Sequence, residues 1–365
     1  SVSVAFTAPS DVGASAITGY RVQSDDGIGA SGTSSPVNVT GLTNGTSYTF
    51  NVWAINPFGY SSPSAASGSV SPALAQRAFF NGGVIAVSPD RTSEIDQFTI
   101  TSTGNAVDWG NLTDLSSLGC AFGSTTRGIV FLGSTNSGTV NQINYFDVTS
   151  TGNGSDFGDD LVTQNDMIGA SNSTRGLAAG GGSVINTIRY VTIASLGNAT
   201  DFGDMTIARL SLGAVASPTR ACFGGGFNDE SSSTHNLDII DYVTIGSTGN
   251  ATDFGDLTVG RNGVSASSNS TRGLFFGGNN NNTIDYITIA STGNATDYGD
   301  LPSTSYSGGS SAAGLTRALV GGTTNNGDTV TFVIIASTGS VGDFGNLQQT
   351  KRSAPACSSA HGGLS

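Results

Sequence analysis

From about residue 76 onward the sequence repeats one unit six times, and this repeat constrains the fold more than any other feature. A turn glycine is followed four residues later by an aspartate, then by an aromatic residue and a second glycine, as in TGNATDYG. An arginine opens every unit. The six aspartates are Asp108, Asp156, Asp201, Asp253, Asp297 and Asp343. The six arginines are Arg77, Arg127, Arg175, Arg220, Arg272 and Arg317. Repeats of this length indicate one supersecondary unit used many times.

Each unit has one segment of fixed length and one of variable length. The interval from the aspartate to the next arginine is 19 or 20 residues, whereas the interval from the arginine to the turn glycine ranges from 21 to 29. Four strand-like runs fit into each unit, and we name them a to d: small and polar (GVSASS), apolar with a closing glycine pair (RGLFFGG), alternating (TIDYITIAS), and the run with the aspartate and the aromatic residue. Four strands per repeat are typical of a β-propeller blade. The expected fold is therefore all-β, with six blades.

The chain ends are expected to complete this propeller. The first unit begins at strand b, and the C-terminal sequence RSAPACSSAHGG matches strand a and the start of strand b, with His361 in place of the arginine. We therefore expect the C-terminal strand to pair with the first unit and close a six-bladed ring, which would remove the exposed sheet edges.

The paired glycines and the aromatic residues of strands c and d resemble kelch repeats. The run IDYVTIGSTGNATDFGDL, with its recurrent TGN turn, is similar to repeats in tail-fibre proteins of marine and cyanobacterial viruses. This resemblance implies a virion-borne fibre or adhesin, displayed outside the cell and assembled with other virion proteins, with homo-oligomers that increase avidity.

Residues 1–72 carry a different pattern of short alternating strands. In TGLTNGTSY, Tyr48 follows Leu42 across a turn, which resembles the tyrosine corner of a fibronectin type III module. The module is expected to lack its first strand and to serve as a spacer. The expected organisation is a partial fibronectin type III sandwich at 1–72, a linker at 73–75 and a kelch-like propeller at 76–365.

Composition argues against several classes of function. The net charge is −13 and Lys351 is the single lysine, so there is no basic surface for nucleic acid or anionic lipid. No apolar run is long enough to cross a bilayer, and we expect no membrane insertion. Three scattered cysteines (Cys120, Cys222 and Cys357) suggest buried core residues rather than a disulfide framework or zinc site. We expect no cofactor and no metal, although the aspartate pairs in DFGD leave calcium as an alternative.

No nucleophile–histidine–acid set is visible, so we do not expect an enzyme. The repeated arginines and aspartates could form a charged central ring, but a clamp between blades, made by arginine and carboxylate, is the favoured interpretation because every blade has it. Arg209, Arg261 and Arg352 mark a second, partial arginine position.

The length variation falls mostly in the b–c loops, which share one face with the d–a loops, so this face should carry recognition. Its polar and aromatic residues suit a host cell-surface glycan or receptor. The candidate ligand-binding residues are Asn228, Asp229, Glu230, His235, Asn279, Asn280, Asn281, Asn282, Tyr306, Asn325 and Asn326. Three alternatives remain: a structural decoration or fibre node of a virion, a polysaccharide-cleaving enzyme, and a secreted bacterial surface adhesin.

Overall fold

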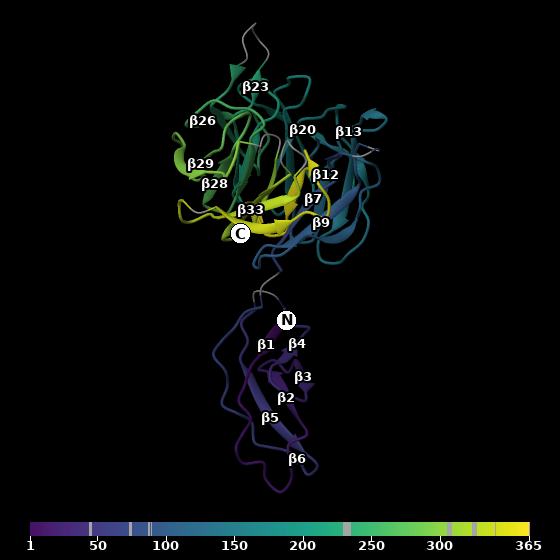
Figure 1. Cartoon of the computed structure of the whole chain (residues 1–365), viewed down its shortest axis with the longest axis vertical. Coiled ribbons are helices and arrows are strands. Elements are labelled where there is room, and N and C mark those ends of the chain that lie inside the picture. Colours follow the sequence, from purple (N-terminus) through teal and green to yellow (C-terminus); the bar gives the residue numbers. More distant parts are fainter. Residues whose placement is uncertain are drawn as a thin grey trace. The chain divides into compact units, whose positions relative to one another are not determined.

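The computed structural model of the chain is all-β and divides into two compact units, residues 1–74 and 75–365 (Figure 1). It describes residues 1–43, 46–72, 75–86, 88, 90–228, 235–304, 309–322, 327–339 and 341–364. The described part of the chain contains no helix long and apolar enough to cross a membrane.

The described part of the first unit forms two antiparallel sheets. One pairs β1 (Val2–Val4) with β4 (Val37–Val39), and the other has the order β3 (Gly29–Gly32), β2 (Gly19–Ser24), β5 (Phe50–Asn56), β6 (Gly59–Tyr60). Their buried side chains, among them Val22, Val39 and Phe50, form one core. Tyr48 is 3% exposed, and its hydroxyl accepts a hydrogen bond from Thr43 N at 3.0 Å. This contact is the tyrosine corner expected from the sequence.

Within its described residues, the second unit contains six four-stranded antiparallel sheets in chain order, each with strands a, b, c and d side by side. We number them sheets 1 to 6. Sheet 1 comprises β36 (Ala356–Ser358), β7 (Arg77–Asn81), β9 (Glu94–Thr99) and β10 (Val107–Asn111). Sheet 2 comprises β11 (Cys120–Gly123), β12 (Arg127–Phe131), β15 (Gln142–Asp147) and β16 (Ser155–Asp159). Sheet 3 comprises β17 (Ile168–Ser171), β18 (Arg175–Ala179), β19 (Thr187–Thr192) and β20 (Thr200–Asp204). Sheet 4 comprises β21 (Gly213–Ala216), β22 (Arg220–Gly224), β25 (Ile239–Thr244) and β26 (Thr252–Asp256). Sheet 5 comprises β27 (Ser265–Ser268), β28 (Arg272–Phe276), β29 (Thr283–Thr288) and β30 (Thr296–Asp300). Sheet 6 comprises β31 (Ser310–Ala313), β32 (Arg317–Gly321), β33 (Thr329–Ile334) and β34 (Val341–Asn346).

Three small hairpins or pairs lie between these strands: β8 (Val84–Ile85) with β35 (Lys351–Arg352), β13 (Ser134–Thr135) with β14 (Gly138–Thr139), and β23 (Phe227–Asn228) with β24 (His235–Asn236). A short 3-10 helix, η1 (Gly362–Leu364), follows β36.

Sheet 1 joins the two ends of the second unit. The C-terminal strand β36 pairs with β7 in the register Cys357 to Phe79, as expected from the sequence. In Figure 1 the C-terminal segment, in yellow, lies alongside β7. The residues after β36 do not continue into a strand b, because β7 already occupies that place in sheet 1. They turn into η1 instead, so the sequence match of His361 to the repeated arginine is wrong.

The core of the second unit lies between sheets rather than within them. Each of six buried clusters joins one sheet to the next, and one of them joins sheet 6 to sheet 1 through Leu319, Phe344, Phe80 and Phe98. The inner strands also contact one another in sequence: β11 with β17, β17 with β21, β21 with β27, β27 with β31, β31 with β36, and β36 with β11. Burying a large apolar side chain contributes about 1.5–3 kcal/mol, so these clusters hold the sheets together.

Candidate functional site

The repeated turn residues join the outer edges of neighbouring sheets. In the TGN turn of sheet 5, Gly293 N donates to Phe254 O of sheet 4 at 2.7 Å, and Asn294 Oδ1 accepts from Asp256 N at 3.2 Å. Gly255 approaches this turn so closely that a Cβ would lie 2.5 Å from Gly293 O. The same contacts recur between sheet 6 and sheet 1, where Asn346 N donates to Asn105 Oδ1 at 3.1 Å. The face with the a–b and c–d turns, which we call the turn face, is thus tied by backbone and amide bonds.

The repeated arginines also join neighbouring sheets, but their partners differ from those expected. Arg272 Nη1 donates to Ile335 O of sheet 6 at 2.9 Å, and its guanidinium lies 4.3 Å from the ring centroid of Tyr286. Arg317 makes the corresponding bond to Ile100 O of sheet 1 at 3.5 Å. The partners are therefore a carbonyl of the next sheet and an aromatic face of the same sheet.

The six repeated aspartates are exposed, and none forms a salt bridge with these arginines among the residues described. The prediction that these arginines and aspartates form ion pairs between blades is therefore wrong. Strand alternation explains this, because the aromatic residue that follows each aspartate faces the core and leaves the aspartate outward.

Buried ion pairs occur at a different position, where the d–a segment of one sheet reaches the third residue of strand c in the next. Arg209 contacts Asp241 at 2.9 Å and Arg261 contacts Asp285 at 2.9 Å, with all four side chains nearly fully buried. Thr206 and Thr258 donate to the same carboxylates. Desolvation lowers the pKa of Arg209 and of Arg261, while the facing aspartates oppose this change.

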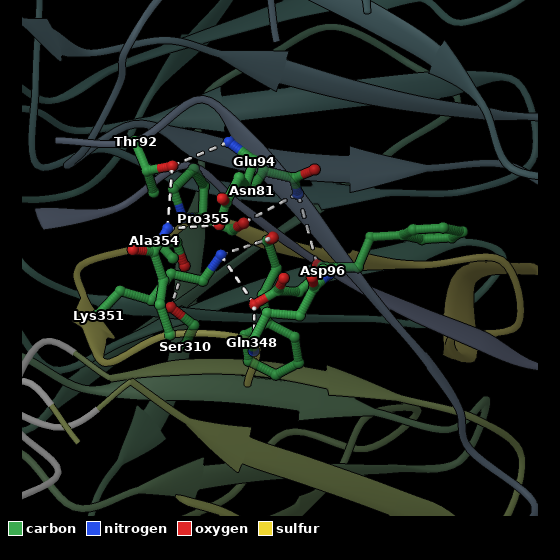
Figure 2. A network of polar contacts seen from close by, with 12 residues as sticks. Asn81, Thr92, Glu94, Asp96, Ser310, Gln348, Lys351, Ala354 and Pro355 are labelled. Carbon is green, nitrogen blue, oxygen red and sulfur yellow. Dashed lines mark hydrogen bonds and ion pairs between the residues drawn. The ribbon is translucent and has the colours of Figure 1, made fainter. Parts of the chain in front are cut away.

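Figure 2 shows the version of this pair between sheets 6 and 1. Lys351 Nζ lies 3.0 Å from Asp96 Oδ2, and both side chains are fully buried. Gln348 N donates to the same carboxylate oxygen at 3.4 Å. Arg209 and Arg261 thus have Lys351 as their counterpart in this d–a segment. Arg352, which the sequence suggested, is exposed.

Sheet 3 carries the pair with its charges reversed. Arg189 occupies the strand c position and contacts Asp160 of the preceding d–a segment at 3.1 Å, with both side chains buried. Burial raises the pKa of Asp160, although Arg189 opposes the shift.

In sheet 2 the strand c residue is Asn144, whose Oδ1 accepts from Thr113. These residues were not among those expected from the sequence to join the sheets. The strand c positions are nevertheless visible in the repeat as Asp96, Asn144, Arg189, Asp241, Asp285 and Thr331.

The candidate ligand-binding residues are only partly brought together. Asn228 and His235 face each other in the β23–β24 hairpin, where Asn228 is buried and His235 exposed. Asp229, Glu230, Tyr306, Asn325 and Asn326 lie outside the described residues.

In the Asn279–Asn282 segment, two asparagine side chains form hydrogen bonds and the other two are exposed. Asn281 Oδ1 accepts from Thr283 N at 2.7 Å, and Asn282 Nδ2 donates to Leu301 O at 3.1 Å. Asn279 and Asn280 are exposed. Asn281 and Asn282 thus stabilise the b–c connection, which leaves Asn279 and Asn280 as the outward-facing amides of this segment.

Among the described residues, three b–c insertions have secondary structure and lie on the other face of the second unit, which we call the loop face. They are β8, β13–β14 and β23–β24, and β8 pairs with β35 of a d–a segment. A cavity of about 120 Å³, which we call the recess, lies where the six d–a segments enter the inner strands. Its lining includes residues of all six sheets, among them Ala121, Asp166, Leu212, Ser265 and Pro355.

Five residues in the left-handed backbone region surround the recess, and we call them the rim. They are Leu118, Asp166, Ser211, Gly263 and Ser353, with φ angles of 56°, 51°, 54°, 64° and 52°. Their main chains bond in series: Leu118 N to Ser353 O at 3.0 Å, Asp166 N to Leu118 O at 2.7 Å, Ser211 N to Asp166 O at 3.3 Å, and Gly263 N to Ser211 O at 2.8 Å. Non-glycine residues in this region carry strain and are concentrated at functional sites.

The far end of the inner strands is covered by η1 and His361. A second cavity there, of about 50 Å³, is lined by inner strands and His361. His361 Nε2 lies 2.9 Å from Gly123 O and Nδ1 accepts from Gly363 N at 3.1 Å. A neutral ring with the proton on Nε2 satisfies both contacts, and burial lowers the pKa of His361.

The cysteines are inert core residues, as expected. Cys120, Cys222 and Cys357 are buried and unpaired, and burial raises the pKa of Cys222 and of Cys357 to about 12. Within the described ranges, no three histidine, cysteine or acidic residues are placed to hold a metal ion.

Comparison with known families identifies part of the chain. Residues 1–69 match the fibronectin type III domain, and this segment is a fibronectin type III domain. The comparison with curated proteins finds no match to the chain.

Proposed function

We propose that this chain is an attachment protein of the tail-fibre type, displayed on a virion, that binds a host cell-surface glycan or receptor through its loop face. In this proposal the six sheets are blades of a closed, kelch-like β-propeller, and the fibronectin type III domain is a spacer. The observation that carries the proposal is the difference between the two faces: the turn face repeats one set of bonds at five sheet boundaries, whereas the loop face carries individual insertions and the recess.

The contacts between sheet 6 and sheet 1 support the closed ring. Those sheets share a buried apolar cluster, an arginine–carbonyl bond and the same turn contact that joins sheets 1 to 5 in series. A rigid scaffold with variable loops on one side is a common arrangement for recognition. The kelch and viral resemblance supports the assignment to a virion and the partnership with other virion proteins and copies of the chain.

The test is retention of the purified chain on a panel of immobilised bacterial surface polysaccharides, together with an assay for newly released reducing ends. We expect retention without release. Release of reducing ends would replace the proposal with a polysaccharide-cleaving enzyme. No retention by the polysaccharides or by intact cells would contradict attachment and favour a structural role.

Variants in a b–c loop test whether retention on polysaccharide depends on the loop face. Asn279→Ala with Asn280→Gly removes only exposed amides, because glycine keeps the left-handed backbone of Asn280 (φ 54°). Asp156→Asn changes an exposed aspartate of outer strand β16. We expect the first variant to weaken retention and the second to leave it unchanged. Equal retention by both variants would argue against the asparagine segment as part of the site.

A further inference from the structure

The recess contains polar groups that nothing in the described structure satisfies. The side chain of Ser265 lines it, Ser265 is 4% exposed, and its Oγ is buried without a hydrogen-bond partner. Ser311 is half-buried and lines both this cavity and the far one, and its Oγ is also buried without a hydrogen-bond partner. Buried hydroxyls normally have partners, and an unpaired one costs free energy. Neither hydroxyl oxygen is open to solvent in this conformation. A rotation about χ1 would turn either one toward a ligand in the recess, which can then supply the missing bond.

Asp166 adds a carboxylate to the same cavity. Its main chain is fixed in the rim, but its side chain makes no hydrogen bond or ion pair within the described residues. Burial raises the pKa of Asp166, with no donor or cation to lower it. An ionised carboxylate is only an acceptor, so the missing partner must present donors.

The remaining walls are mixed: Ala121, Leu212 and Val264 contribute apolar surface, and Ser211, Ser310 and Ser353 contribute polar groups. A volume of about 120 Å³ is several times the roughly 10–15 Å³ that one buried water requires. Apolar surface with a few convergent polar groups is typical of small-ligand sites. The bonded rim holds the entrance open in one conformation, which reduces the ordering cost of binding.

We propose that the recess binds the terminal ring of a neutral saccharide, with two adjacent hydroxyls donating to Asp166 and with Ser265 and Ser311 completing the polar contacts. A sugar ring matches the site because it has C–H faces for the apolar walls and hydroxyl donors for the carboxylate. Acidic sugars are disfavoured by Asp166 and by the net charge of −13. A divalent cation is disfavoured because it requires several carboxylate or carbonyl oxygens.

This inference rests on the proposed attachment role and names the part of the loop face that recognises the ligand. The probes are the methyl glycosides of glucose, galactose, mannose and rhamnose, titrated against the full chain by saturation-transfer NMR. We expect at least one to bind. Asp166→Asn should weaken it by roughly tenfold to a hundredfold, because it replaces a charge-assisted acceptor by a neutral amide. Asparagine tolerates a left-handed backbone, so the rim should survive.

A matched pair of serine variants separates binding from folding. Ser265→Ala and Ser267→Ala each remove an unpartnered buried hydroxyl from the same strand, but Ser267 lines the far cavity. Both should keep or raise the unfolding temperature. Only Ser265→Ala should weaken the glycoside, by roughly threefold to tenfold.

The outcomes distinguish this inference from the proposed function. In two outcomes the wild type is retained on cells or polysaccharide: either no glycoside binds, or Asp166→Asn binds the glycoside equally well. Either result would contradict saccharide binding in the recess but leave the attachment role intact. Glycoside binding without retention would contradict attachment while the recess stands. Binding of tetramethylammonium but of no glycoside would overturn the saccharide in favour of a cation.

Discussion

The two faces of the second unit are joined between sheets by different chemistry. The turn face repeats neutral bonds, such as that from Asp204 N to Asn250 Oδ1 at 3.1 Å, and its end of the inner strands is covered by η1. The loop face has buried ion pairs beneath it and, above them, the larger of the two cavities described, which contains the Asp166 carboxylate. Neutral repeated bonds suit a scaffold. A larger cavity with a carboxylate and a strained rim suits a site.

The largest effect is expected where the loop face is supported between sheets 6 and 1. Lys351→Met removes the cation and leaves Asp96 buried without a charge partner, which should cost about 3–5 kcal/mol. Chemical denaturation measures this loss. Adding Asp96→Leu should recover most of it, because an apolar pair can replace a buried ion pair.

The control for this prediction is the neighbouring exposed residue. Arg352→Met should change the free energy of unfolding by less than about 0.5 kcal/mol. If Lys351→Met were equally mild, the ion pair would not support this face.

A smaller effect is expected at the covered end of the inner strands. A Cβ on Gly363 would lie 1.7 Å from Ser171 O, so Gly363→Ala must displace η1. We expect a loss of about 1–3 kcal/mol, typical of overpacking. Leu364→Ala, at a half-buried position of the same short helix, provides the comparison in thermal unfolding. An unchanged unfolding temperature in Gly363→Ala would show that η1 is not packed as described.

On the turn face, Asn250→Ala should cost about 1 kcal/mol through the loss of one neutral hydrogen bond. Asn294→Ala removes the same contact one sheet further on and should cost the same amount. Denaturation of the two single variants and the double variant should give additive values, because the sites are independent. Unequal or strongly coupled losses would contradict a uniform turn face.

The smallest effect concerns pH. Because the folded pKa of His361 is lowered, its contribution to stability is complete above the unfolded pKa of about 6.5 and is lost as pH falls below it. His361→Gln removes this titration. Between pH 7 and pH 5 the wild type should therefore lose more unfolding free energy than His361→Gln does. A difference independent of pH would contradict the buried neutral ring.

Much of this architecture could be predicted from the repeat. The four strands of each repeat and the buried cysteines follow from strand periodicity. The pairing of β36 with β7 follows because the first repeat begins at strand b and lacks a strand a of its own. The exposure of the repeated aspartates could also have been derived, because adjacent strand residues face opposite sides.

The site was harder to derive, for physical reasons. The ion pairs join residues of different sheets, and Arg189 with Asp160 reverses the order of charges seen in Arg209 with Asp241. At the rim, Gly263 carries a strong sequence signal for a left-handed backbone and Asp166 a weaker one. Leu118 and Ser353 adopt this conformation through tertiary bonds. Unsatisfied hydroxyls such as Ser265 Oγ are visible only once the neighbouring atoms are placed.

The most direct measurement of the difference between the faces is hydrogen–deuterium exchange of the full chain with and without a retained polysaccharide. Protection is expected in peptides that carry the rim and Ser265, with no change in peptides that carry the TGN turns at Gly197, Gly249 and Gly293. Protection of the turns, with the rim unchanged, would place recognition on the opposite face and contradict the account.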